Sequence, residues 1–222
     1  MTRLPPIGLL GGSFDPVHAG HLQLARDAQT ALGLAEVVFV PAGRPWQKDR
    51  ITPAVDRMRM VERALSGHAG WRADDCEIAR AGPSYTIDTL RDWRAQIGPD
   101  RPLVWILGFD QLRQLDTWHR WEELTQCAHL AFAQRAGITM TALPSTVRNW
   151  IAARRGTPAD LSNAPNGTVI EFSMRPIDCS ATLLRQAIAE NRPAETLAHC
   201  LPPDVLAYIR THRLYSTQAL PR

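Results

Sequence analysis

Two histidines and a glycine pair lie close together near the N-terminus, and their types and spacing suit the binding of phosphate. Gly11 and Gly12 end a short apolar run, and His18 and His21 follow where a helical pattern begins. Glycine lets a backbone approach an anion closely, and the free N–H groups of a helix start favour negative charge. Imidazoles three residues apart would share a helical face and could donate hydrogen bonds to phosphate oxygens. The loop therefore predicts a phosphate site, in competition with an ordinary packed or solvated histidine pair.

Other kinds of site fit the sequence less well. A zinc-binding histidine pair more often has a spacing of four with a glutamate general base, which is missing here. A dinucleotide fingerprint needs G-x-G-x-x-G, and residues 11–22 do not contain it. The cysteines are far apart in the sequence, so we expect reduced, mostly buried thiols rather than a disulfide scaffold or a zinc ribbon. They are Cys76, Cys127, Cys179 and Cys200.

The elements that must position this loop alternate between apolar runs and helical patterns. Apolar runs that predict strands lie at residues 7–10, 37–40, 103–107 and 130–133, with a further strand near 168–172. Helical patterns cover residues 20–32, 53–65, 85–97 with Ser84 as N-cap, 147–155, 180–190 and 204–211. Strands that are apolar throughout and separated by helices are typical of a parallel sheet covered on both faces. We therefore expect an α/β fold with a doubly wound parallel sheet and its ligand at the carboxyl ends of the strands.

Length and composition narrow the class of protein further. The 222 residues are 45% apolar and 21% charged, which predicts one globular domain over residues 1–222. Within it, residues 137–167 are expected to form a peripheral insertion and 180–215 a C-terminal helical part. The net charge of +3 is too small for a nucleic-acid footprint and suits anion binding at one site. The short first apolar run and the lack of a membrane-length segment predict a cytoplasmic protein without nucleic-acid or membrane partners.

Several motifs in a fixed order carry a resemblance to a known family. Residues 11–21 resemble the (H/T)-x-G-H signature of the nucleotidylyltransferase superfamily, with His18 at its first position. Residues 82–90 resemble the P-S-Y-T-x-x-T-L segment of bacterial nicotinate mononucleotide adenylyltransferases, and 108–110 resemble their G-x-D motif. Residues 118–121 resemble a W-x-x-W region, and 180–185 the second signature, S-(S/A)-T-x-(I/L)-R. The resemblance spans residues 11–215 and implies a Rossmann-like nucleotidylyltransferase fold.

The resemblance implies transfer of AMP from ATP to nicotinate mononucleotide, giving deamido-NAD and pyrophosphate in NAD biosynthesis, with Mg²⁺ accompanying ATP. The mononucleotide phosphate, largely dianionic at neutral pH, would attack the α-phosphate in line without a general base. The alternatives are nicotinamide mononucleotide as acceptor, acceptance of both mononucleotides, or a nucleotide-binding regulator without catalysis. Oligomeric state does not follow from the sequence.

The resemblance also implies roles for particular residues. Trp118 would stack on the pyridine ring, main-chain N–H groups near Tyr85, Thr86 and His119 would hold the nicotinate carboxylate, and Asp110 would accept from ribose hydroxyls. Gln47 stands before Lys48 where many family members have histidine. The implied catalytic residues are His18, His21, Lys48 and Arg185. The implied ATP-binding residues are Gly11, Gly12, Ser13, Phe14, His18, His21, Gly108, Asp110, Arg135, Ser180, Thr182 and Arg185. The implied mononucleotide-binding residues are Ser13, Lys48, Tyr85, Thr86, Trp118 and His119, and no residue is implied to be a metal ligand.

Overall fold

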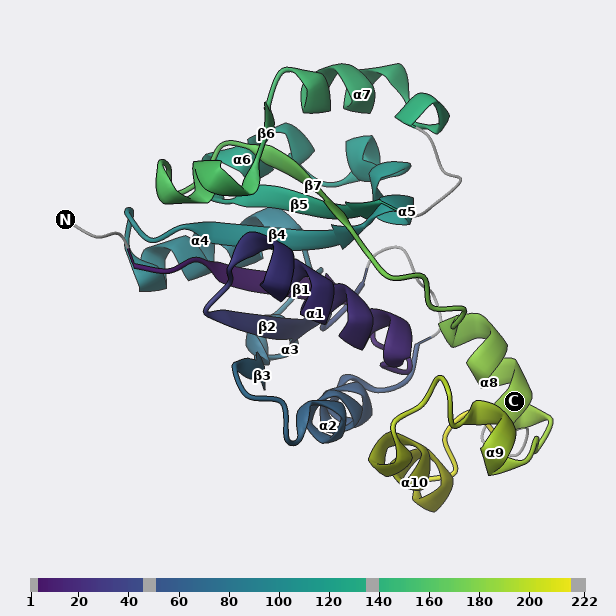
Figure 1. Ribbon diagram of the computed structural model, residues 1–222. Helices are drawn as coiled ribbons and strands as arrows, with labels where there is room; N and C mark the ends of the chain where they lie inside the picture. Colours follow the sequence, from purple (N-terminus) through teal and green to yellow (C-terminus); the bar gives the residue numbers. More distant parts are fainter. Residues whose placement is uncertain (1–3, 46–50, 135–139, 217–222) are drawn as a thin grey trace.

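The computed structural model describes residues 4–45, 51–134 and 140–216, and within these ranges seven strands form one sheet (Figure 1). The strand order is β3-β2-β1-β4-β5-β7-β6, and neighbouring strands pair in parallel throughout. The strands are β1 (Ile7–Gly12), β2 (Glu36–Pro41), β3 (Trp71–Ala73), β4 (Leu103–Gly108), β5 (His129–Gln134), β6 (Arg155–Gly156) and β7 (Val169–Ser173). The order reverses between β1 and β4, so the predicted doubly wound parallel sheet is confirmed.

Helices cover both faces of the sheet (Figure 1). They are α1 (Ala19–Leu32), α2 (Ala54–Leu65), α3 (Cys76–Ala79), α4 (Thr86–Ile97), α5 (Phe109–Leu112), α6 (Leu124–Cys127), α7 (Ser145–Ala152), α8 (Ala181–Ala189), α9 (Ala194–Leu197) and α10 (Pro203–Thr211). Short 3₁₀ segments lie at Leu115–Thr117, Trp121–Glu123, Met140–Ala142 and Pro158–Ser162.

Two hydrophobic clusters, one on each face of the sheet, explain the continuous apolar runs. Along β1, Leu10 belongs to the cluster that α1, α2, α8 and α10 cover. Leu9, its neighbour, belongs to the other cluster, which α4 and α7 cover. Because successive strand residues point to opposite faces, a strand buried on both sides must be apolar at every position.

The segment over residues 140–167 adds to the sheet edge and to both clusters, with Leu161 in the cluster that α1 covers. Helix α7 buries Val147, Trp150 and Ile151, and β6 pairs with β7 at the edge of the sheet. This β6 strand and β3 are missing from the sequence prediction, because runs of two and three residues are too short to show a period.

The start of α4 differs from the prediction. The helix begins at Thr86, with Tyr85 rather than Ser84 at the N-cap position. The Ser84 hydroxyl instead accepts hydrogen bonds from the N–H groups of Gly43 (2.9 Å) and Arg44 (3.1 Å), in the loop after β2. The Ser84 hydroxyl therefore bonds to a loop that is remote in sequence instead of capping the adjacent helix.

The expectation of four reduced cysteines is wrong for two of them. Cys179 and Cys200 form a disulfide, with Cα atoms 5.6 Å apart despite a sequence separation of 21. The chain turns back through α8 and α9 and brings the two residues together, which their spacing does not reveal. Cys76 and Cys127 are free thiols, and burial raises the pKa of Cys76 to about 12.

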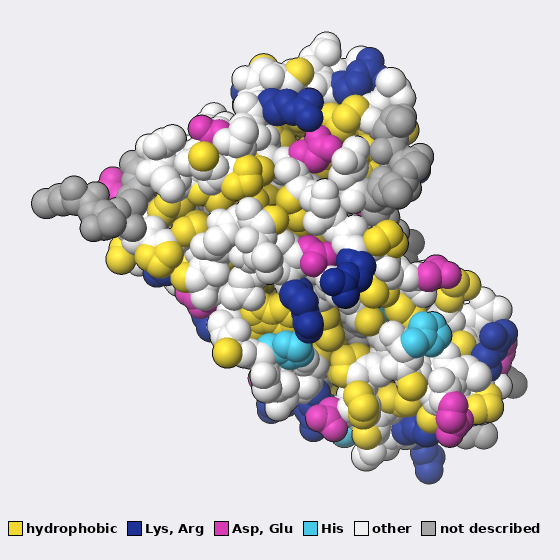
Figure 2. Space-filling model, viewed as in Figure 1, with side chains coloured by type: hydrophobic (Ala, Val, Ile, Leu, Met, Phe, Trp, Pro, Cys, Tyr) yellow, Lys and Arg dark blue, Asp and Glu magenta, His cyan; other side chains and the backbone are white. Residues whose placement is uncertain are grey.

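The surface shown in Figure 2 carries basic and acidic side chains interspersed over the sheet and the C-terminal helices, without a continuous basic stripe on this face. Over the described ranges, none of the helices combines the length and apolar character needed to cross a membrane.

Candidate active site

A cavity of about 670 Å³ opens at the carboxyl ends of β1 and β4, where the strand order reverses. This is where open α/β sheets bind their ligands, and the volume lies within the range of small-molecule sites. The predicted site residues that line it are Gly11, Gly12, Ser13, His18, His21, Thr86, Gly108, Asp110, Trp118 and Ser180. The fold thus brings together segments separated by most of the chain.

His18 and His21 meet through the cap of α1 rather than along a helical face. His18 is the N-cap residue, with extended backbone (φ −148°, ψ 172°), so the prediction that the pair shares one helical face is wrong. The His18 Nδ1 accepts a hydrogen bond from the Gly20 N–H, and the His21 Nδ1 accepts one from the His18 N–H, each at 3.2 Å. The ring centroids are 3.9 Å apart. An imidazole that accepts at Nδ1 carries its hydrogen on Nε2 when neutral, so the cap makes both Nε2 atoms hydrogen-bond donors.

The loop between β1 and α1 is shaped by close packing. A side chain on Gly11 would run into the indole of Trp105 on β4, so only glycine fits there. Phe14 adopts φ 47° and is fully buried. Its ring meets His21 edge-on, with centroids 5.1 Å apart. Phe14 therefore packs against the His21 ring and does not itself line the cavity.

Arg57 on α2 lies beneath two of the loops that border the cavity. Its side chain is fully buried and donates hydrogen bonds to the carbonyl oxygens of Thr52 (2.8 Å), Ser13 (2.9 Å) and Gly43 (3.3 Å). Burial lowers the pKa of this guanidinium, and nearby Asp15 opposes the shift. Sequence reasoning missed Arg57, because an arginine in an amphipathic helix is normally solvent-exposed.

The Asp15 backbone and carboxylate join the two ends of the chain. Arg185 donates to the Asp15 carbonyl oxygen (2.7 Å) and to the Thr182 hydroxyl (3.3 Å). The Asp15 carboxylate accepts from the Tyr215 hydroxyl (2.6 Å) and the Thr52 N–H (3.4 Å). Burial is the main cause that raises the pKa of Tyr215, and the charge of the neighbouring Asp15 raises it further. Arg185 and Thr182 therefore lie next to a cavity residue without lining the cavity themselves.

The opposite side of the cavity carries Trp118 and the start of α4. Tyr85 and His119 flank the lining residues Thr86 and Trp118, and their rings lie 4.5 Å apart between centroids. The Tyr85 side chain forms no hydrogen bond that caps α4. The first N–H groups of α4 therefore receive no capping hydrogen bond from the side chain of the N-cap residue.

Two acidic residues at this edge already have protein partners. The Asp110 Oδ2 accepts from the Gln111 amide (2.8 Å), and the Glu77 Oε1 accepts from the Thr89 hydroxyl (2.7 Å). Burial raises the pKa of Glu77, a cavity residue that sequence reasoning missed. The predicted site residues Lys48 and Arg135 lie outside the described residues.

Comparison with known proteins agrees with this geometry. The chain matches the cytidylyltransferase-like family over residues 9–187. It is 44% identical over 223 aligned positions to a probable nicotinate-nucleotide adenylyltransferase of Laribacter hongkongensis, which covers 99% of both chains. It is 40% identical to the protein of that name from Pseudomonas syringae pv. tomato, over 97% of this chain and 96% of the relative.

Solved structures share the fold at lower sequence identity. The structure of Plasmodium falciparum nicotinic acid mononucleotide adenylyltransferase complexed with NaAD superposes with a TM-score of 0.75 at 15% identity, covering 96% of this chain and 98% of that chain. By its sequence and by the matched family, this chain belongs to the cytidylyltransferase-like family and, within it, to the nicotinate-nucleotide adenylyltransferases, which are nucleotidyltransferases.

Proposed function

We propose that this chain transfers the adenylyl group of ATP to nicotinate mononucleotide, forming deamido-NAD and releasing pyrophosphate. The observation that carries the proposal is the His18–His21 pair at the start of α1, inside the cavity at the strand ends. Two donors held there by the backbone suit a triphosphate, and the relatives at 40–44% identity, which are named nicotinate-nucleotide adenylyltransferases, suggest the acceptor.

The chemistry needs positioning more than it needs proton transfer. The mononucleotide phosphate has a second pKa of about 6 and is already largely dianionic at neutral pH, so no general base has to remove a proton from it. One of its oxygens forms a bond to the α-phosphorus of ATP while the bond from that phosphorus to the β-phosphate oxygen breaks. Holding two anions in line for this step can lower the barrier by about 7–11 kcal/mol in favourable cases.

The phosphates would be bound by groups from both ends of the chain. The His18 and His21 Nε2–H groups donate to phosphate oxygens, and the N-terminus of α8 with Ser180 forms a second anion site. Arg185 can turn from the Asp15 carbonyl oxygen toward the triphosphate, and Lys48 adds a further positive charge. Donors fixed before the reaction stabilise the charge that develops on the leaving pyrophosphate.

The acceptor would bind on the side of Trp118 and α4. Trp118 offers an aromatic face to the pyridinium ring, a cation–π contact. The N-terminal N–H groups of α4 near Tyr85 and Thr86 can bind the nicotinate carboxylate. Asp110 would accept from ribose hydroxyls and Arg135 would lie near the adenine.

Mg²⁺ would be held mainly by the nucleotide. The cavity carboxylates Asp15, Glu77 and Asp110 already accept hydrogen bonds from protein donors, so they do not form a ready cage for the ion. Phosphate oxygens and water are the usual ligands of Mg²⁺ in such sites. When bound, the ion neutralises part of the triphosphate charge. We infer that the chain acts as one domain, since the two signatures meet at one cavity.

Pyrophosphate release with ATP tests the proposal directly. Wild-type protein is assayed with nicotinate mononucleotide and, in parallel, with nicotinamide mononucleotide at equal concentrations. Faster release with the nicotinate form is expected, because its carboxylate can bind the start of α4. Faster release with the nicotinamide form would reassign the acceptor, and no release with either would reject the transferase proposal.

A further inference from the structure

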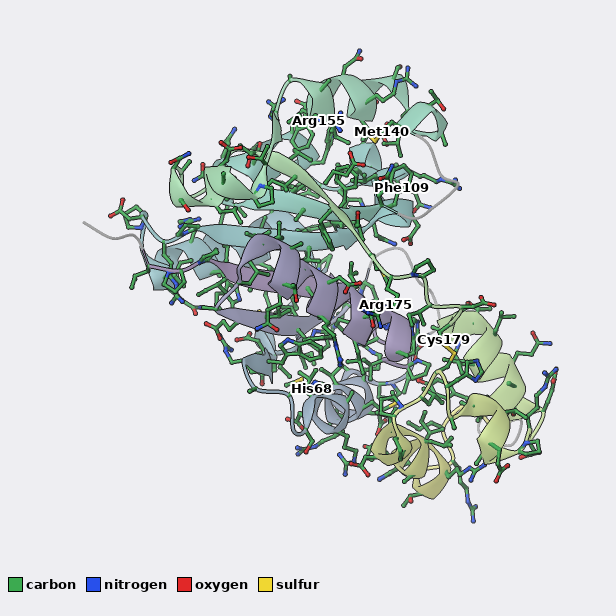
Figure 3. The ribbon with its side chains drawn as sticks, viewed as in Figure 1. His68, Phe109, Met140, Arg155, Arg175 and Cys179 are labelled. Atoms are coloured by element: carbon green, nitrogen blue, oxygen red, sulfur yellow. A yellow bond between two sulfur atoms is a disulfide. The ribbon has the colours of Figure 1, made fainter. Side chains whose placement is uncertain are left out.

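Two sulfur atoms and an imidazole gather where the chain enters α8. Cys179 precedes α8, and His199 and Cys200 follow α9; Figure 3 shows Cys179 at this junction, beside the chain that enters α8. One ligand atom from each side chain lies within 4.8 Å of the other two. Over the described part of the chain, this is the one such group of three or more histidine, cysteine or acidic side chains.

The three side chains have the chemistry of a zinc site. A disulfide bond does not involve the neighbouring imidazole, whereas two thiolates and one imidazole are a ligand set that zinc prefers. At bond lengths of about 2.3 Å to sulfur, a tetrahedral ion would hold the two sulfur atoms about 3.8 Å apart. That separation is shorter than the 4.8 Å within which the three ligand atoms lie, and Cα atoms 5.6 Å apart are close enough for both sulfur atoms to reach one ion.

The surroundings support a site that is both anchored and open. The Cys200 N–H donates to the Leu197 carbonyl oxygen (3.0 Å), and the Cys200 carbonyl oxygen accepts from the Ala19 N–H (2.8 Å) at the start of α1. Cys200 is buried, while His199 is exposed. An ion could therefore enter from the His199 side, and water could take the fourth position.

We propose that the dithiol form of this chain binds one Zn²⁺ through the Cys179 and Cys200 thiolates and a His199 imidazole nitrogen, with water as fourth ligand. Binding releases the two thiol protons to solvent, and the resulting complex carries no net charge. The disulfide and the zinc complex are alternative forms, so the disulfide must first gain two electrons. A phosphine reductant supplies them and becomes its oxide, while water provides the oxygen and the two thiol hydrogens.

Either form would tie the start of α8 to the first turn of α1. Ser180 follows Cys179 directly, and Ala19 is bonded to the Cys200 carbonyl oxygen. The metal would thus lie beside the phosphate end of the cavity, which Cys179 also lines. The zinc proposal does not depend on the adenylyl-transfer reaction.

Cobalt serves as the test ion, because thiolate-to-cobalt charge transfer absorbs in the near ultraviolet. The full chain is reduced with tris(2-carboxyethyl)phosphine, desalted without oxygen and titrated with Co²⁺, followed by Zn²⁺. We expect a charge-transfer band that saturates at one Co²⁺ per chain and disappears on addition of one Zn²⁺. The unreduced protein should give no band. A reduced wild-type protein without a band would overturn the proposal.

Variants assign the ligands. Cys200→Ser should lose most of the band, and Cys127→Ser, a substitution of a free thiol elsewhere, should keep it. His199→Ala changes an exposed side chain, so the protein should fold normally and bind Co²⁺ at least about tenfold more weakly. Unchanged affinity in His199→Ala, or loss of the band in Cys127→Ser, would reject this three-residue site even if Cys200→Ser failed to fold.

Discussion

Substitution of Arg57 by methionine removes the buried guanidinium that joins the loops after β1 and β2. The wild-type side chain makes two hydrogen bonds of 2.8 and 2.9 Å and a longer one of 3.3 Å, all to backbone carbonyl oxygens. A hydrogen bond to a charged group contributes about 1.5–3 kcal/mol, and carbonyl groups left without a donor add a cost. Methionine restores part of the apolar packing. We therefore expect the free energy of unfolding to fall by about 3–5 kcal/mol.

Urea denaturation followed by circular dichroism measures this loss. With a slope of about 2.5 kcal/mol per molar urea, the midpoint should fall by about 1.5 M at an unchanged slope. Arg59→Met is the matched control, since Arg59 lies on the same helix, is exposed and pairs only with Glu62 at the surface among its described ion pairs. It should change stability by about 0.5 kcal/mol or less. Equal effects of the two substitutions would refute the role assigned to Arg57.

Three further predictions concern the cavity. His18→Ala should lower turnover by about 10²-fold through loss of a phosphate donor. The control His68→Ala, which removes a ring stacked on Trp71, should leave turnover near the wild-type value. Turnover is measured as steady-state pyrophosphate release, and near-normal turnover in His18→Ala would contradict the assigned role. Trp118→Ala should raise the KM for nicotinate mononucleotide more than the KM for ATP, and equal increases would argue against stacking on the pyridine ring. Because burial raises the pKa of Glu77, its contribution to stability is present below its unfolded pKa of about 4.5 and is lost as pH rises through the folded value. The melting temperature of Glu77→Gln minus that of wild type should therefore increase from pH 4 to pH 8, and a constant difference would show that the carboxyl group is not destabilised by burial.

The parallel sheet was predictable because its signal is local. Each apolar run is buried on both faces, so every residue in it reports the same environment. The end of α1 was predictable for a similar reason, since Gly33 adopts the left-handed conformation (φ 60°) that glycine accepts readily. The short strands β3 and β6 offer too few residues for any pattern, and only their pairing with β2 and β7 defines them.

In the candidate site, too, the features with a local sequence signal were predictable, and the contacts between distant segments were not. The loop over residues 11–21 predicted a phosphate site and led to the family, although the histidines meet through a helix cap rather than along a helical face. The grouping of that loop with Trp118 and Ser180 in one cavity followed from the fold class together with the motifs. Lys48 and Arg135 stay predictions.

By itself, the sequence determined the features that depend on neighbouring residues: the longer strands, the main helices, the glycine turn and the motifs that identify the family. Only the tertiary structure decided which distant groups meet. Arg57 bonds to a carbonyl 44 residues away, Cys179 pairs with Cys200 across 21 residues, and Tyr215 bonds to Asp15 across 200. A side chain's local pattern says that it is charged, polar or apolar. Its partner depends on how distant segments pack together, which no single segment encodes. For Arg57, this packing buries a side chain expected at the surface and places it in hydrogen bonds to the loops of the candidate site.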